Sequence, residues 1–495
     1  MDEKLGSFLS SFSELVTLAQ QQSPSIENGD ALLRTLTEFL GQPPEQLPVI
    51  LESVPGHRMA DLDIALESIT ARDPQNQLLG IGGGEQRNHS TFSELIQISK
   101  TYHQFPLAQP DFSNLAVGPD EQRKIVSFGL RLFTFDGLPL VILQRDANPR
   151  FGREQATVEV LTPSSHASAA FLSELRSHLA SQSVYKGQVI SFTMSEYGPH
   201  MGGVSFVRRP VLEASEVILP SGVLRRVEDH TLGIGQHAAA LRASGQHLKR
   251  GILLYGPPGT GKTHTVRYLL SKAEGTTAVL LSGTSLARVT EATALARALA
   301  PSIVVLEDCD LIAEDRSFSM GPQPLLFEVL DAMDGLDADA DVSFVLTTNR
   351  VDTLERALAQ RPCRVDLAIE VPVPSEPERL DLLRLYSKRL PFGEDALAQA
   401  AALTSGTTAS FAKELIRRAV LAATLNCEPL TDSHLLSAVE QLMSDDESLT
   451  RSLLGSKVDG SEGDNGEQAD GPAHGGTVSF GSYSNFPLGG THFDE

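Results

Sequence analysis

The 495-residue sequence lacks most features that mark secreted or membrane-spanning proteins. It has no tryptophan, no apolar run near the roughly 18 residues that a membrane helix needs, and only three cysteines, Cys309, Cys363 and Cys427. These cysteines are too few and too far apart for a disulfide framework or a cysteine metal site, which favours a reducing cytoplasm. The start, Met1 to Lys4, does not have the basic-then-apolar layout of a signal peptide.

Positive charge is also scarce. The 40 Lys and Arg residues are outnumbered by 63 Asp and Glu residues, which gives a formal net charge of −23 at pH 7. Nucleic-acid binding depends on clustered Lys and Arg side chains, so this balance argues against nucleic acid as the main ligand. The 41% share of hydrophobic residues is ordinary for globular protein. At this length about three domains are expected.

Residues 1–115 are predicted to be a helical N-terminal region. Apolar residues recur at helical spacing over Leu5–Gln22 and Asp30–Leu40. Four glycines between Gly80 and Gly84 indicate a flexible turn or linker. No catalytic or ligand-binding motif occurs in this region. A role in protein interaction is a hypothesis that rests only on its position at the N-terminus.

Residues 116–211 are predicted to form a small α+β domain. Apolar and polar residues alternate in its first half, and Asp136-Gly137 between two such runs is a strong hairpin signal. A helix is predicted at Ala167–Ser181, followed by strands at Gln188–Met194 and Gly203–Val207. We expect this domain to dock a partner or adaptor protein.

The second half of the chain predicts three further parts. Residues 212–375 alternate strand and helix patterns, as a parallel α/β sheet would, and residues 376–445 predict a helical lid. Residues 446–495 are predicted to be an acidic, glycine-rich and disordered tail, because this composition cannot bury a core. As an alternative, the aromatic residues of the tail dock on a partner or on a central pore of the protein itself. These aromatic residues are Phe480, Tyr483, Phe486 and Phe493.

A complete phosphate-binding loop lies inside the α/β region. It follows the apolar run Gly251–Tyr255 and precedes a helix-forming segment, which is the strand–loop–helix context that the motif requires. The glycines let main-chain N–H groups curl around phosphates, and the start of the helix adds partial positive charge. Lys262 is placed to reach the β- and γ-phosphates, and the Thr263 hydroxyl to bind Mg²⁺. The residues predicted to bind the nucleoside triphosphate are Gly256, Pro257, Pro258, Gly259, Thr260, Gly261, Lys262, Thr263 and His264.

Two carboxylates follow a second apolar strand. The run Ile303–Leu306 ends in Glu307 and Asp308. A nucleotide-hydrolysing site needs such a pair, one acid to orient Mg²⁺ and its waters and the other to polarise the attacking water. With Thr263, both acids are therefore candidate metal-site residues. Asn349 follows a third predicted strand and is suited to positioning the attacking water.

With these motifs, the chain resembles the AAA family of ring-forming ATPases over Leu212–Met443. The resemblance implies that Asn349 is the first sensor of the family. It also implies that Arg361 and Arg364 are arginine fingers reaching the γ-phosphate of a neighbouring subunit in a hexameric homo-oligomer, with ATP and Mg²⁺ as cofactors. The runs that carry the resemblance are Thr347-Thr348-Asn349-Arg350, Arg361-Pro362-Cys363-Arg364-Val365-Asp366, Val371-Pro372-Val373-Pro374 and, more loosely, Thr404–Ser410. The candidate catalytic residues are Lys262, Glu307, Asp308, Asn349, Arg361 and Arg364.

Three departures from the family pattern stand out. The acid pair runs Glu307-Asp308, where the family has Asp-Glu, so the acid in the catalytic position is one methylene shorter. Cys363 replaces the glycine of the finger loop, a mild change in backbone freedom. The stretch Leu286–Ala292 has no aromatic residue where the family usually carries a loop that grips a threaded polypeptide. Threading by such a loop is therefore not expected.

The function predicted first is that of an ATP-driven remodeller that changes the assembly state of a protein client. An alternative is an ATP-controlled scaffold or switch with slow hydrolysis, which the reversed acids and the missing aromatic favour. A third hypothesis, a nucleic-acid motor or loader, would require an electropositive pore. None of the three involves a membrane.

Overall fold

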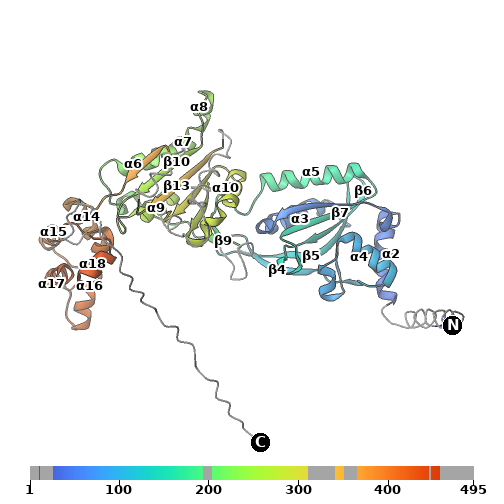
Figure 1. Cartoon of the computed structure of the whole chain (residues 1–495), viewed down its shortest axis with the longest axis horizontal. Helices are drawn as coiled ribbons and strands as arrows, with labels where there is room; N and C mark the ends of the chain where they lie inside the picture. Colours follow the sequence, from blue (N-terminus) through green and yellow to red (C-terminus); the bar gives the residue numbers. More distant parts are fainter. Residues whose placement is uncertain are drawn as a thin grey trace, which may run out of the picture. The chain divides into compact units, whose positions relative to one another are not determined.

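Figure 1 shows the computed structural model of the protein. The structure describes residue 11 and residues 26–192, 203–309, 340–350, 365–444 and 447–456. Three predictions lie outside these residues: almost all of the helix Leu5–Gln22, the two arginines Arg361 and Arg364, and the tail beyond Ser456.

A seven-stranded sheet organises the N-terminal part of the described chain. Its strand pairs are antiparallel, and the predicted hairpin is confirmed, since Phe135 pairs with Leu138 and both turn residues, Asp136 and Gly137, have positive φ. In sheet order the strands are β1 (Val49–Pro55), β7 (Gln155–Leu161), β6 (Leu138–Arg145), β5 (Gln122–Phe135), β2 (Gln77–Ile81) and β3 (Leu107–Ala108), with β4 (Asp111–Ala116) paired to β5.

Helices cover both faces of this first sheet. On one face α3 (Met59–Thr70) and α5 (Ser165–Ser181) bury a cluster that includes Phe133 and Phe171. On the other face α2 (Ile26–Leu40) and α4 (Phe92–Tyr102) bury a second cluster around Phe92. The domain therefore has a hydrophobic core on each side of the sheet.

The prediction of a helical region over residues 1–115 is incomplete, because strands lie in it beside helices α2, α3 and α4. Strand β1 pairs with β7, β2 and β4 pair with β5, and β3 pairs with β2, so the boundary at residue 115 divides one sheet. Gly80 does not belong to a flexible linker either. It lies in β2, where an added Cβ would be 2.0 Å from the Gln109 carbonyl oxygen. The short strands escaped prediction because their partners are distant in sequence, as when Val49 pairs with Leu161.

A second seven-stranded sheet forms the α/β core. In sheet order its strands are β14 (Leu367–Glu370), β10 (Arg250–Tyr255), β13 (Val342–Thr348), β12 (Ser302–Glu307), β11 (Thr277–Ser282), β8 (Val189–Phe192) and β9 (Val204–Val207). All neighbouring pairs are parallel except β8 with β9. The predicted parallel α/β architecture is confirmed.

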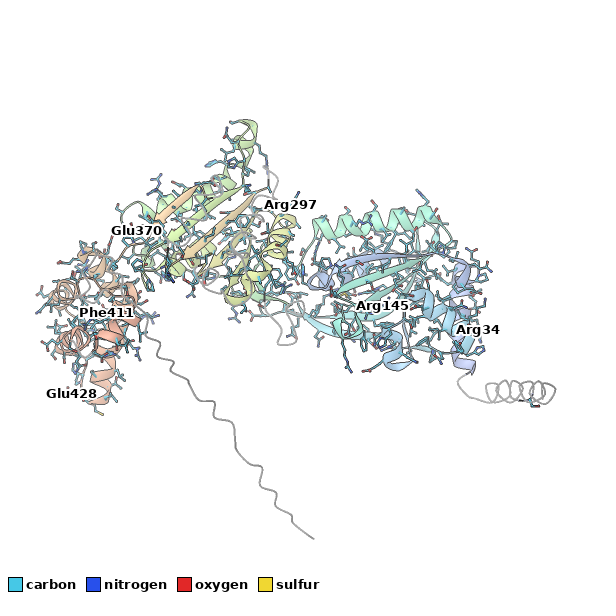
Figure 2. All side chains as sticks on the ribbon, viewed as in Figure 1. Arg34, Arg145, Arg297, Glu370, Phe411 and Glu428 are labelled. Atoms are coloured by element: carbon cyan, nitrogen blue, oxygen red, sulfur yellow. The ribbon has the colours of Figure 1, made fainter. Side chains whose placement is uncertain are left out.

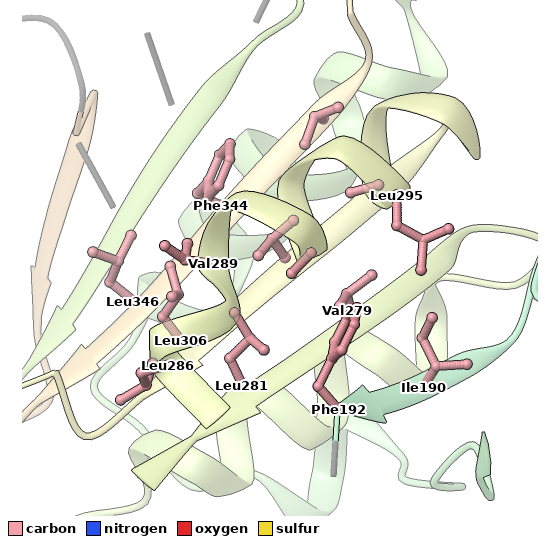
Figure 3. Packing of buried hydrophobic residues seen from close by; sticks show 14 of the residues in the cluster. Ile190, Phe192, Val279, Leu281, Leu286, Val289, Leu295, Leu306, Phe344 and Leu346 are labelled. Carbon is pink, nitrogen blue, oxygen red and sulfur yellow. The ribbon is translucent and has the colours of Figure 1, made fainter. Parts of the chain in front are cut away.

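Helices also cover both faces of the second sheet. Helix α9 (Lys262–Lys272) packs on one face through Val266 and Leu269. Helix α10 (Val289–Ala298) packs on the other, where Val289 and Leu295 meet strand residues such as Val279 (Figure 3). The strands of the ATPase core are thus held between two apolar layers.

The boundary predicted at residue 211 is also wrong. Strands β8 and β9 were assigned to the small α+β domain, but Val189 pairs with Ala278 of β11, so they extend the second sheet. The segment that leads into β8 is hydrogen-bonded on both sides. The main-chain N–H of Val184 donates to Asp61 of α3 at 2.8 Å, and that of Gly187 donates to the Thr277 hydroxyl at 3.0 Å. A strand period does not encode which sheet edge the strand joins.

The predicted helical lid is confirmed as α14 (Glu376–Tyr386), α15 (Glu394–Leu403), α16 (Ala409–Leu425) and α17 (Asp432–Met443). Their shared core includes Phe411, which is fully buried and labelled in Figure 2. The tail does not begin at residue 446, because a further helix, α18 (Ser448–Leu453), follows the lid. Within the described residues, none of the helices has the length and apolar character needed to cross a membrane.

Two buried ion pairs join the helices and strands of the N-terminal domain. Arg131 of β5 donates to Asp63 of α3 at 2.7 Å, and Gln144 donates to the same carboxylate at 2.9 Å. Arg145, labelled in Figure 2, pairs with Glu159 between β6 and β7. Burial lowers the pKa of the Arg131 guanidinium, and the charge of Asp63 opposes this effect.

Replacing Arg131 with methionine is expected to lower the free energy of unfolding of this domain by about 3–5 kcal/mol, because the Asp63 charge would stay buried without its counter-ion. Arg123→Met is the matched control, since Arg123 and its partner Glu67 are exposed and should contribute less than ~1 kcal/mol. Urea denaturation followed by circular dichroism measures both. Equal losses would contradict the buried-pair interpretation.

Candidate nucleotide site

The parallel pairing of three strands brings the predicted motifs to one edge of the sheet. Strand β10, which precedes the phosphate-binding loop, pairs with β13, and Tyr255 lies opposite Thr348. Strand β12, which precedes the acid pair, is the other neighbour of β13, and Leu306 lies opposite Leu346. Because all three strands run the same way, their carboxyl ends lie side by side, where α/β sheets bind ligands.

The phosphate-binding loop turns tightly between β10 and α9. Gly256, Gly259 and Gly261 all have positive φ, which side-chain-bearing residues rarely adopt. Helix α9 begins at Lys262, so the N–H groups of its first turn have no acceptor within the helix and are available to phosphate oxygens. The Lys262 ammonium is buried and donates to the Gly256 and Pro257 carbonyls, each at 2.8 Å. These contacts hold the cation over the loop that would receive the phosphates.

Close backbone contacts fix the two ends of the loop. A Cβ at Gly256 would lie 2.2 Å from the Val371 carbonyl oxygen, and the Val371 N–H donates to Tyr255 at 2.7 Å. Thr260 closes the loop by donating its hydroxyl to the Pro257 carbonyl at 2.9 Å. Glycine at position 256 is therefore required by the approach of the chain that follows β14.

The side chain of His264, a predicted nucleotide-binding residue, contacts another part of the protein. Its Nε2 atom lies 3.0 Å from the Glu216 carbonyl oxygen, on the segment that precedes the α/β core. Its main-chain N–H belongs to the first turn of α9. Any contact of His264 with a phosphate is therefore expected from the backbone.

Glu307 lies against the first residues of α9. The Thr263 side chain lies close enough to its carboxylate to lower its pKa, as expected for two ligands of one Mg²⁺ ion. Burial raises the pKa of Glu307, the charge of Asp308 raises it further, and Arg267 and Thr263 oppose the shift. Two adjacent carboxylates and a hydroxyl form an oxygen donor set that fits Mg²⁺.

A bound cation would relieve this charge concentration. The described residues contain no group of three His, Cys, Asp or Glu side chains that could hold a metal by themselves. Magnesium usually completes its shell with water and substrate phosphates, so the protein oxygens fit a metal that arrives with a nucleotide.

Asp308 is oriented by the neighbouring strand. Its N–H donates to the Thr347 hydroxyl at 3.1 Å, and its φ of 53° is unusual for a residue other than glycine. The Asn349 amide nitrogen is 3.5 Å from the Asp308 carboxylate. The acid and the predicted sensor are thus neighbours, so one water could contact both.

Of the predicted arginine-finger segment, only the last residues, Val365 and Asp366, belong to the described part of the chain. Arg361 and Arg364 lie outside the described residues, whereas the Asp366 carboxylate accepts the Gly251 N–H at 2.9 Å. This bond ties the residues after the predicted fingers to the start of β10.

Contacts from the lid were not predicted. The Ser410 N–H, at the start of α16, donates to the Gly259 carbonyl of the loop at 3.1 Å. Leu454 and Gly455, after α18, also touch the loop at Gly259 and Pro258. Ser410 lies in the segment that loosely matches the family pattern, which could have indicated its contact. No sequence signal marks Leu454 or Gly455.

Comparison with known proteins agrees with this geometry. Residues 252–373 match the model of the "ATPase family associated with various cellular activities (AAA)". The chain is 34% identical to the proteasome-activating nucleotidase of Methanocaldococcus jannaschii, over 42% of this chain and 52% of the relative. A protein of the same name from Thermococcus onnurineus is 28% identical over 54% of this chain and 70% of the relative. The ATP-dependent zinc metalloprotease FtsH of Slackia heliotrinireducens is 32% identical over 46% and 31%. The chain spans about half the length of the first of these relatives.

Without Mg²⁺, Glu307→Gln is expected to raise the thermal unfolding midpoint at neutral pH. The pKa of Glu307 is raised in the fold, so its ionised form costs stability above that pKa, and the cost disappears as the pH falls toward the value of ~4 for an unfolded glutamate. The gain should therefore shrink between pH 8 and pH 5, as measured by calorimetry in EDTA.

The control is Glu370→Gln, the same change at an exposed position at the end of β14 (Figure 2), which should have no comparable effect. With Mg²⁺ and ATP the wild-type protein should have the higher unfolding midpoint, because its Glu307 carboxylate gains a metal contact. If Glu307→Gln is less stable than wild type in EDTA at pH 8, the protein already stabilises the negative charge of Glu307 without a metal.

Proposed function

Because residues 252–373 belong to the AAA family of ATPases, we propose that this protein is an ATP-hydrolysing ring that remodels a protein client. The contact between Thr263 and Glu307 at the phosphate-binding loop carries the proposal, together with the Asp308–Asn349 pair beside it. The four residues come from three segments that the sheet brings to one edge.

Each residue has a role in hydrolysis. The loop N–H groups and Lys262 bind the β- and γ-phosphates, and Thr263 and Glu307 hold Mg²⁺. When bound, the ion neutralises charge on the phosphate oxygens. Asp308 accepts a proton from the attacking water while Asn349 orients it. The bond from water oxygen to γ-phosphorus forms as the bond to the β–γ bridging oxygen breaks, releasing ADP and phosphate.

Client recruitment falls to the N-terminal domain in this proposal. The domain has its own sheet and a core on each face, and Val184 and Gly187 tie the segment after α5 both to α3 and to the second sheet. Movement of the ATPase core could therefore reach a bound client through this segment. The names of the relatives, a proteasome-activating nucleotidase and a metalloprotease, favour a protein as the client.

An alternative is an ATP-controlled switch that hydrolyses slowly. One observation favours it over threading of a polypeptide. Leu286 and Val289, in the stretch where the family usually has a gripping loop, are buried in the core of the second sheet, and Arg288 packs 4.4 Å from the Phe192 ring centre. Stimulation of ATPase activity by an unfolded probe protein such as casein would favour the remodeller, and an unchanged slow rate would favour the switch.

Asp308→Asn should keep nucleotide affinity and lower hydrolysis by about 10²–10⁴-fold, because the proton acceptor of the attacking water is lost. Glu307→Gln should instead weaken the dependence on Mg²⁺. Calorimetric titration and steady-state ATPase assays measure the two properties, and Lys262→Ala serves as the variant that loses binding. Normal hydrolysis by Asp308→Asn with an inactive Glu307→Gln would reverse the roles of the two acids.

Arg364→Ala should leave ATP binding intact and lower turnover by about 10³-fold or more, since an arginine finger acts on the neighbouring subunit. Mixing inactive Arg364→Ala with inactive Asp308→Asn protein should restore part of the activity, because some interfaces then contain both intact elements. Turnover per subunit should also rise with protein concentration as rings assemble. A monomer with constant specific activity and no rescue on mixing would rule out the ring.

A further inference from the structure

Two residues after helix α18, Leu454 and Gly455, lie directly on the phosphate-binding loop, and Ser456 follows them. We name residues 454–456 the strap. Gly455 has a φ of 80°, and a Cβ there would lie 2.0 Å from the Pro258 carbonyl oxygen. Gly259 has a φ of 76°, and a Cβ there would lie 2.8 Å from the Leu454 carbonyl oxygen. Two glycines therefore allow the backbone of the strap to touch the backbone of the loop.

The strap is anchored to the lid. The Leu454 carbonyl accepts a hydrogen bond from the Thr408 hydroxyl at 2.6 Å, at the start of α16. The buried Arg451 guanidinium donates to the Leu442 carbonyl at 2.8 Å, at the end of α17. The Ser456 N–H donates back to the Arg451 carbonyl at 2.9 Å. Movement of the lid is thus transmitted to the strap through hydrogen bonds at both ends.

The Pro258–Gly259 peptide is contacted twice from the lid side. The Ser410 N–H binds the Gly259 carbonyl at 3.1 Å, and the strap packs next to it. Ser456, next to Gly455, is 6% exposed, and its hydroxyl has no hydrogen-bond partner among the described residues. A buried hydroxyl without a partner is costly, and Ser456→Ala tests whether a bound nucleotide supplies one.

We propose that the strap forms one wall of the nucleotide site and slows nucleotide release by holding the phosphate-binding loop in shape. This inference rests on the proposed role of that loop in ATP binding. A loop held by fixed contacts loses less conformational freedom when it binds phosphates, so its complex is longer-lived. The strap must leave Pro258 and Gly259 before the loop relaxes and ADP departs. Gly455 and Ser456 are positioning residues in this scheme.

Gly455→Ala tests the strap in the full chain. The added methyl group cannot fit 2.0 Å from a backbone oxygen, so the strap must leave the loop. We expect dissociation of N-methylanthraniloyl-ADP, chased with excess ADP in a stopped-flow instrument, to be at least about fivefold faster, the lower end of typical coupling between linked elements. The Michaelis constant for ATP should rise in parallel.

Gly222→Ala is the matched control. Gly222 also has a φ of 80°, but nothing lies within 4 Å of its Cβ position, so the change adds the same backbone strain without a clash. It should leave the release rate unchanged. A second variant, Arg451→Met, loosens the strap from its anchor without touching the loop and should also speed release. Arg451→Met tests the role of the strap if Gly455→Ala does not fold.

The outcomes separate this inference from the proposed function. Wild-type release rates in both Gly455→Ala and Arg451→Met would overturn the role of the strap while leaving ATP binding in place. A wild-type protein that binds no labelled ADP would overturn the nucleotide site itself. Faster release in Ser456→Ala as well would support a contact between its hydroxyl and the nucleotide.

Discussion

The parallel pairing of β13 with β10 on one side and β12 on the other is the constraint on which the site depends. It places the phosphate-binding loop, the Glu307-Asp308 pair and Asn349 at one edge of the sheet. Buried apolar layers under α9 and α10 hold the strands in this order. In this arrangement Thr263 lies close to Glu307, and Asn349 lies beside Asp308.

The two acids at this edge of the sheet are held in different ways. Burial and the charge of Asp308 raise the pKa of Glu307. The ionised carboxylate is therefore costly without a nearby cation, and a bound Mg²⁺ ion would offset that cost. The shorter acid in the catalytic position is held by a left-handed backbone and by the Thr347 hydroxyl. The reversed acid pair therefore alters the reach of the second carboxylate but keeps it beside Asn349.

In the proposed function, the parts outside the nucleotide site separate force generation from recognition. The segment around Leu286 is packed into the core, which is why the proposed contact with a client is assigned to the N-terminal domain and not to a loop of the ATPase sheet. At the other end of the chain, Leu454 and Gly455 connect the lid to the phosphate-binding loop. The proposed control of nucleotide release by the strap depends on these backbone contacts between the lid and the loop.

The sequence by itself determined the parts whose geometry is local. The loop from Gly256 to Thr263, the strand that ends in Glu307, the hairpin at Asp136-Gly137 and the lid helices were all predicted, because each depends on neighbouring residues or on a regular period. Only the tertiary structure decided that β1 to β4 complete the first sheet, that β8 joins β11, and that Gly455 lies on Pro258. Strand partners and close backbone contacts join residues far apart in the chain, and a short strand or a glycine looks the same in the sequence whichever neighbour it meets.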